Sequence, residues 1–181
     1  MKIDSLDTLF QEELKDLYDT EKRLVRAIPK MAKNAASEDL RDALLEHLDE
    51  TRDHVARLEQ IFEMLDMPAK GKTCAGMKGI IEEGEETMSA DGDDVLLDCA
   101  IISAAQRAEH YEMAAYASAR MMAEHLGHNE IADLLQQTWD EENDADERLS
   151  DIANQLFTSI RWGTDEGNAP AVKTAGSSSA W

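Results

Sequence analysis

Apolar residues recur at alternating spacings of three and four along four long stretches of the chain, residues 5–35, 39–65, 95–126 and 130–156. In the first stretch the series runs through Phe10, Leu14, Leu17, Leu24 and Ile28. This spacing places apolar side chains on one face of an α-helix, so each stretch predicts an amphipathic helix. Proline is scarce and good helix formers are abundant, so we expect an all-α protein.

The connections between these stretches predict how the helices are joined. Short turns separate the first stretch from the second and the third from the fourth, whereas residues 66–94 form a long connection. Within it, AGMKGIIEEGEETMS has the pattern of a short amphipathic helix. Two short-turn pairs joined by one crossover are typical of ferritin-like four-helix bundles. We expect such a bundle over residues 1–160 and a flexible C-terminal tail, without periodicity, over residues 161–181.

The composition limits the partners that the chain can have. Asp and Glu number 39 against 18 Lys and Arg, which gives a formal net charge of -21 at pH 7. This charge disfavours nucleic acid and membrane surfaces and favours cations, although an acidic surface also serves solubility alone. No stretch is apolar enough to span a bilayer and the N-terminus lacks a secretory signal, so we expect a cytoplasmic protein.

Carboxylates interrupt the apolar face of every long predicted helix. These inward-facing residues, one from each helix, are Glu21, Glu50, Glu109 and Glu142. Glu21 and Glu50 lie at similar distances from the turn that joins their helices, about 22 Å at 1.5 Å per residue. The same holds for Glu109 and Glu142 about their own turn, so all four carboxylates can meet at one height in the bundle.

Four carboxylates in an apolar core are costly unless their charge is balanced. Two divalent cations would balance them, as in the dimetal sites of helical bundles, which use two single Glu residues and two Glu-x-x-His elements. This chain lacks Glu-x-x-His, because Asp53 and Ala145 follow Glu50 and Glu142 at three residues. The candidates for the remaining ligands are His47, His54, Glu112 and Asp146. Such an oxygen-rich site favours Fe, with Mn as the second possibility.

A simpler interpretation is open for each of these residues taken alone. A single Glu on an apolar stripe is more often at its edge than in the core, and the alignment of four on four helices is what favours a metal site. His47 and His54 are each equally well explained as a ligand, as an outer hydrogen-bond donor or as a polar core residue whose hydrogen bonds are satisfied.

Several segments resemble the YciE/YciF-type stress-associated ferritin-like family over about residues 5–156, most specifically DLYDTEKRL and AEHYE. The resemblance implies a ferritin-like bundle, usually dimeric, with a dimetal site. By position its acidic residues fall on Glu21, Glu50, Glu109 and Glu142, with Glu112 and Asp146 nearby. The chain departs from the family at His54, where related members tend to carry Gln, and this would make the site richer in nitrogen.

Together these observations predict a homodimer that binds two divalent ions, Fe or Mn, and that oxidises Fe(II) with O2 or H2O2 or removes peroxide in a stress response. Glu50 and Glu109 are the candidate bridging ligands, and Glu21 and Glu142 the candidate terminal ones. The alternative is a non-catalytic dimeric scaffold with a structural or vestigial metal site. Storage of iron would need a multi-subunit shell, which one chain does not demonstrate.

Overall fold

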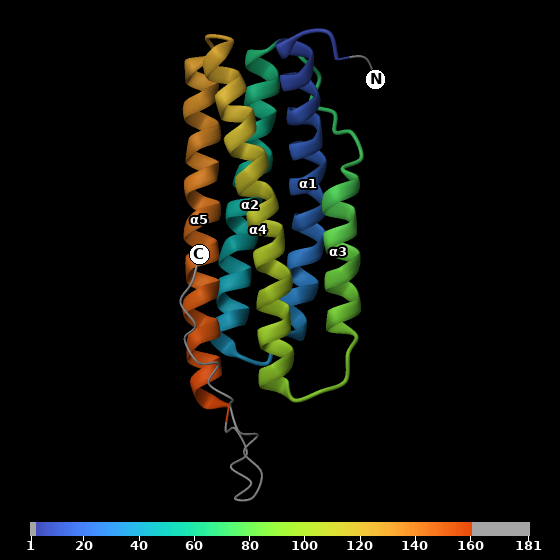
Figure 1. Ribbon diagram of the computed structural model, residues 1–181, viewed down its shortest axis with the longest axis vertical. Coiled ribbons are helices and arrows are strands. Elements are labelled where there is room, and N and C mark those ends of the chain that lie inside the picture. The colour runs from blue at the N-terminus through green and yellow to red at the C-terminus, as the bar shows by residue number, and fades with distance from the viewer. Residues whose placement is uncertain (1–2, 161–181) are drawn as a thin grey trace, which may run out of the picture.

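The computed structural model describes residues 3–160, and over that range the chain forms five α-helices (Figure 1). They are α1 (Leu6–Asn34), α2 (Glu38–Met64), α3 (Ala75–Met88), α4 (Asp94–His125) and α5 (Asn129–Ser159). All five predicted helices are present, with ends within a few residues of the expected ones. The predicted tail, residues 161–181, lies outside the described residues. Among the helices described here, none combines the length and apolar character needed to cross a bilayer.

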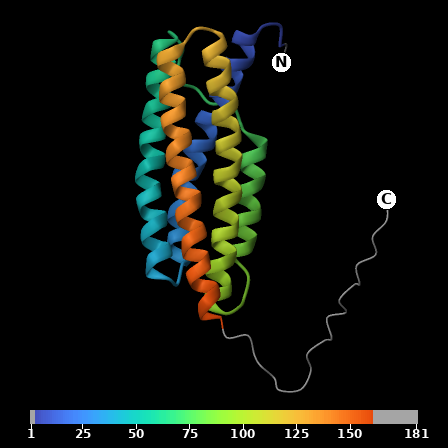
Figure 2. The same ribbon diagram turned by 60° about the vertical axis from the view of Figure 1, so that its left-hand side comes forward.

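The four long helices form a bundle of two antiparallel hairpins, α1 with α2 and α4 with α5 (Figure 1). α1 also packs beside α4, and α2 beside α5. The crossover returns the chain to the end of the bundle where α2 began, so α2 and α4 run in the same direction, and α3 lies outside the bundle against α1 and α4 (Figure 2). The predicted four-helix bundle, with a short extra helix in a long crossover, is confirmed.

Side-chain caps mark where three of the four long helices begin. Ser5, Ser37 and Asp93 precede α1, α2 and α4, and each side chain accepts a hydrogen bond from a backbone N–H in the first turn of its helix. Such caps satisfy amide groups that have no partner within the helix. Gly127 ends the α4–α5 turn with φ of 81°, a left-handed conformation that glycine adopts without strain. The turns therefore fix the lengths on which the alignment of the helices depends.

The apolar core consists of two clusters with a polar layer between them. The cluster near the α1–α2 turn includes Leu24, Ile28, Leu40, Leu44, Ile102 and Leu149. The cluster near the α4–α5 turn includes Phe10, Leu14, Leu58, Tyr116, Ile131 and Leu135. Between them lie buried polar side chains from all four long helices. Each helix is therefore amphipathic along its whole length except where it crosses this layer.

Asp98 connects the two hairpins at one end of the bundle. Its side chain extends from α4 and is 2% exposed, and its two oxygens accept hydrogen bonds from the backbone N–H groups of Ala36 (2.9 Å) and Ser37 (2.8 Å). Both donors lie in the α1–α2 turn. Because the carboxylate satisfies two amide groups that have lost access to water, it holds α4 in a fixed position against that turn.

We expect Asp98→Ala to lower the free energy of unfolding by about 2–3 kcal/mol, because it leaves two buried N–H groups without an acceptor. Urea denaturation followed by circular dichroism would measure the change. Asp91→Ala, in the exposed loop before α4, is the matched control and should change the free energy by less than about 0.5 kcal/mol. Equal stabilities of the two variants would contradict the connecting role of Asp98.

Candidate metal centre

The polar layer holds six ionisable side chains, each 7% exposed or less. α1 contributes one Glu, α2 two His, α4 two Glu and α5 one Glu. They are Glu21, His47, His54, Glu109, Glu112 and Glu142. All six were candidate ligands in the sequence, and the structure brings them to one height because the two hairpins have similar lengths.

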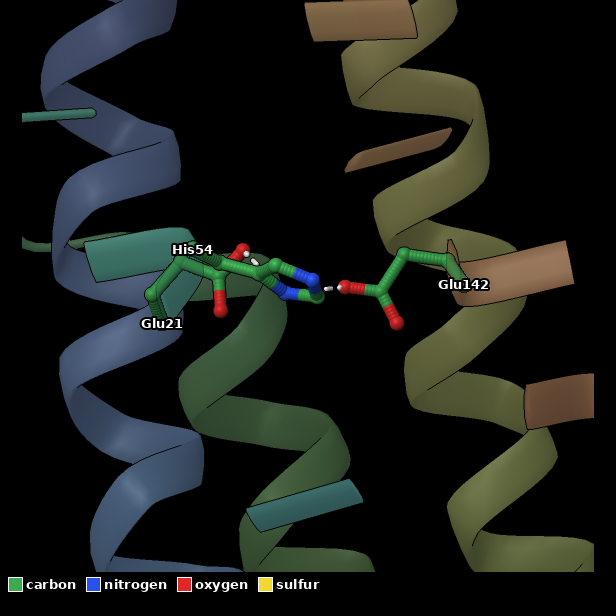
Figure 3. Close-up of side chains that lie close together, drawn as sticks. All are labelled: Glu21, His54 and Glu142. Carbon is green, nitrogen blue, oxygen red and sulfur yellow. Dashed lines mark ion pairs between the residues drawn. The ribbon is translucent and has the colours of Figure 1, made fainter. Parts of the chain in front are cut away.

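Two groups of three side chains could each hold a metal ion. We call them the His54 group, which is Glu21, His54 and Glu142, and the His47 group, which is His47, Glu109 and Glu142. Within each group the ligand atoms all lie within 4.8 Å of one another. In the His54 group the imidazole lies between the two carboxylates, with Nδ1 3.6 Å from Glu21 Oε1 and 3.0 Å from Glu142 Oε1 (Figure 3).

Glu142 belongs to both groups. His47 Nε2 lies 3.4 Å from Glu109 Oε1 and 3.6 Å from Glu142 Oε2. Glu142 thus presents Oε1 to His54 and Oε2 to His47. If both groups held an ion, Glu142 would be a ligand common to both. The sequence had suggested terminal binding for Glu142 and bridging roles for Glu50 and Glu109.

Each histidine is oriented by a second carboxylate on its outer side. His47 Nδ1 lies 3.2 Å from Glu50 Oε2, and His54 Nε2 lies 2.9 Å from Glu141 Oε2. Metal-binding histidines commonly donate their other ring N–H to a carboxylate, which fixes the tautomer and the ring orientation. In both residues, the nitrogen that faces the layer is therefore the one left for an ion.

Arg57 holds the carboxylate that orients His54. Its guanidinium donates two hydrogen bonds to Glu141, of 2.7 and 3.1 Å, and one of 2.5 Å to Thr138 Oγ1. The Arg57 side chain is only 11% exposed, so this pairing is little weakened by solvent. This contact could not be predicted from the sequence, because Arg57 and Glu141 lie 84 residues apart. Tyr116 adds a further constraint by donating its hydroxyl to Glu21 Oε1.

Many polar atoms of the layer have no hydrogen-bond partner. His54 Nδ1 and Glu142 Oε1 are close, but their geometry is not that of a hydrogen bond. The unpartnered atoms of the layer are His54 Nδ1, Glu21 Oε2, Glu109 Oε2 and both carboxylate oxygens of Glu112 and Glu142. Folded proteins rarely leave so many buried polar atoms unsatisfied in one place. A set of carboxylate oxygens and imidazole nitrogens fits divalent Fe or Mn, which would satisfy these atoms.

The charges of the carboxyl groups reflect this crowding. Burial raises the pKa of Glu109 well above its usual range, although His47 opposes the shift. Burial also raises the pKa of Glu112, and the charges of Glu142 and Glu21 add to that rise. Without a cation, the layer therefore keeps protons on some of its carboxyl groups, because four buried negative charges at this spacing repel one another.

The histidines carry the compensating positive charge in the metal-free protein. Burial alone would lower the pKa of His47, but Glu109 and other carboxylates raise it to about 10. Burial alone would also lower the pKa of His54, but the surrounding carboxylates of Glu141, Glu142 and Glu21 raise it to about 12. Metal binding requires neutral imidazole, so an arriving cation would displace these protons.

Three of the candidate ligands lie outside both groups: Glu112, whose carboxyl group is buried in the layer, and Glu50 and Asp146. The side chain of Glu50 is 45% exposed and contacts the outer nitrogen of His47. Asp146 Oδ1 accepts a hydrogen bond of 2.9 Å from Gln106 and lies 3.3 Å from His110 Nε2. Three of the four aligned carboxylates therefore meet as expected, and α2 presents its two histidines to the layer in place of Glu50.

A family model described as a domain of unknown function, DUF892, matches residues 5–159. The chain belongs to the DUF892 family. It is 36% identical over 154 residues to Protein YciF of Escherichia coli strain K12, a match that covers 84% of this chain and 93% of that protein. The resemblance to the YciE/YciF-type family is confirmed.

Solved structures of related proteins share the bundle. The crystal structure of the E. coli stress protein YciF matches with a TM-score of 0.84 at 34% identity, covering 87% of this chain and 100% of that one. YcfI from Rhodopseudomonas palustris matches with a TM-score of 0.81 at 36% identity, covering 82% and 95%. A protein from Xanthomonas campestris, at 19% identity and a TM-score of 0.68 over 85% and 94% of the chains, shows the shared fold alone.

We expect Glu112→Met to raise the free energy of unfolding of this DUF892 protein, freed of metal by a chelator, by about 1–3 kcal/mol. The reason is that Glu112 is fully buried and neither of its carboxylate oxygens has a partner. Urea denaturation in the presence of chelator would measure the effect. Glu50→Met, at a half-exposed position beside the layer, should give no comparable gain. A less stable Glu112→Met protein would show that the carboxyl group is satisfied without metal.

Proposed function

We propose that this protein binds two divalent ions, Fe in preference to Mn, one in each histidine group, and uses them for redox chemistry with O2 or H2O2. The observation that carries the proposal is the position of Glu142. It offers one oxygen to each group, and neither oxygen has a hydrogen-bond partner. A carboxylate shared by two compact N and O ligand sets is the arrangement of a dimetal centre in a helical bundle.

Different residues of the layer would hold the two ions. Glu21 and His54 would hold one ion, His47 and Glu109 the other, and Glu142 both, while Glu112 places a further buried carboxylate beside them. Bound Fe or Mn would supply the exchange of electrons with the oxidant.

The surrounding residues orient the ligands and exclude water. Glu50 and Glu141 fix the two imidazole rings, and Tyr116 fixes the Glu21 carboxylate. The apolar clusters above and below the layer exclude water from its two ends. The ligands are therefore held in place before an ion arrives, which lowers the entropy lost on binding.

A second candidate function is a scaffold whose metal centre is structural. The related YcfI from R. palustris is provisionally described as a structural protein. In that case the ions would stabilise the bundle without reacting. Assembly as a homodimer and a cytoplasmic location belong to both hypotheses and stay predictions.

The test is metal analysis of protein purified in air without added metal, followed by assays of Fe(II) oxidation and H2O2 consumption. We expect close to two equivalents of Fe or Mn, falling below about half an equivalent in Glu109→Ala plus Glu142→Ala, which removes a ligand from both groups. Glu63→Ala, at an exposed position of α2, is the control and should keep the metal.

The outcomes separate the two hypotheses. Parent protein that stays below about half an equivalent after incubation with Fe(II) or Mn(II) would rule out the dimetal proposal. Full occupancy with neither activity would support the scaffold. Full occupancy with Fe(II) oxidation or H2O2 loss, both abolished in the double variant, would support the redox function.

The outer carboxylates give a second test of metal binding. We expect Glu141→Gln to weaken binding of the ion in the His54 group by about tenfold, because the neutral amide orients His54 less firmly and makes its ring less basic. Glu50→Gln should have a smaller effect, since Glu50 is 45% exposed and water can replace it. Competition titration with Co2+ and a chromophoric chelator would measure both. Equal affinities in the parent and Glu141→Gln would show that Glu141 has no part in binding.

A further inference from the structure

The two histidine groups differ in their access to solvent. A cleft of about 100 Å³ between α2 and α5 is lined by both His47 and Glu109. Ala43 of α2 and Ala145 of α5 also line it, and their small side chains leave the space open. The cleft has room for several water molecules. It therefore connects the surface to the His47 group.

The His54 group has no part in the lining of this cleft. Glu21 and His54 are 0% exposed, and Glu142 is 1% exposed. On the outer side of His54, Glu141 and Arg57 close the space through their hydrogen bonds. An ion in the His54 group could leave only if these buried contacts opened, which is slower than passage through an existing cleft.

The charges along the cleft favour a cation. Glu50 and Asp144 carry carboxylates where it meets the surface, and Glu109 at its inner end has an unpartnered oxygen. Besides His47 itself, the basic residue of the lining is Arg148, which is paired with Glu46 of α2. A narrow space lined by negative charge with apolar walls raises the local concentration of cations.

We infer that this cleft is the port through which a divalent cation enters and leaves the His47 group, and that the ion of the His54 group exchanges much more slowly. The inference rests on the proposed binding of two ions. It adds that the two positions are unequal, one exchangeable and one retained, and it assigns the exchange route to Ala145 and the residues around it.

The experiment follows the release of Co2+, whose visible absorption reports its ligands. Metal-free protein is loaded with two equivalents and mixed with excess EDTA in a stopped-flow instrument. We expect two phases of one equivalent each, with the faster at least about tenfold quicker. Ala145→Leu should slow only the fast phase, by about tenfold, because the larger side chain fills the cleft. Ala114→Leu, on an exposed face of α4, is the matched control and should match the parent.

A second pair of variants tests the charge of the port without changing its packing. Asp144→Asn should slow the association of Co2+ about twofold at low ionic strength and have little effect at high salt. Asp133→Asn, also exposed on α5 but away from the cleft, should leave the rate unchanged. If thermal melting shows that Ala145→Leu is misfolded, the comparison of Asp144→Asn with Asp133→Asn tests the port in its place.

The results distinguish failure of the port from failure of the proposed function. Parent protein that binds no Co2+ would overturn both the port and the proposed dimetal centre. Two bound ions that leave in a single phase, or a fast phase unaffected by Ala145→Leu and an association rate unaffected by Asp144→Asn, would overturn the port and leave the dimetal centre standing.

Discussion

Six ionisable side chains buried at one height are the constraint on which the rest of this structure depends. Carboxylates and imidazoles removed from water are costly unless they are paired or bind a cation. Their cost falls only when all four long helices bring their polar positions to the same level. A shift of one helix by a single turn would place a carboxylate inside an apolar cluster, so the layer selects one alignment of the bundle.

The alignment is supported at several points outside the layer. Short turns, with the Ser37 cap in the first and Gly127 in the second, join the helices of the two hairpins. Asp98, near the start of α4, joins that helix to the α1–α2 turn. Arg57 joins α2 to α5 through Glu141. These contacts are polar, partly buried and directional, in contrast to the apolar clusters, which tolerate sliding more readily. The ligand geometry is therefore maintained by contacts that do not themselves touch an ion.

Periodicity predicted the helices of this protein well because each long helix has an apolar stripe that is interrupted only at the polar layer. The equal distances from the turns also placed Glu21, Glu109 and Glu142 correctly at one height. The rotation of α2 about its own axis could not be predicted from periodicity or from distances to the turns. Glu50 lies about 60° around the helix from His47 and about 40° from His54, at 100° per residue. A small rotation about the helix axis decides which of them face the core, and packing against α1 and α5 sets that rotation.

The outer support of the histidines was also hidden in the sequence. Glu141 stands in the run DEEND, in which four of the five residues carry a carboxylate and none is marked out from the others. Its special position comes from a partner on another helix, Arg57, and no local pattern marks such a pair. The resemblance to the YciE/YciF-type family located the region of the site, whereas only the spatial arrangement separates the inward-facing residues from their outer partners.

The shared carboxylate of Glu142 has a consequence for the thermodynamics of the two groups. An ion in one group would fix the side chain and draw electron density toward itself, which changes the free energy of binding in the other group. By reciprocity, each ion would alter the affinity for its neighbour by the same factor. The first ion would already hold the Glu142 carboxylate in place, which would favour binding of the second ion. Electrostatic repulsion between the two cations would oppose it. A single side chain would thus couple the free energies of binding at two adjacent sites.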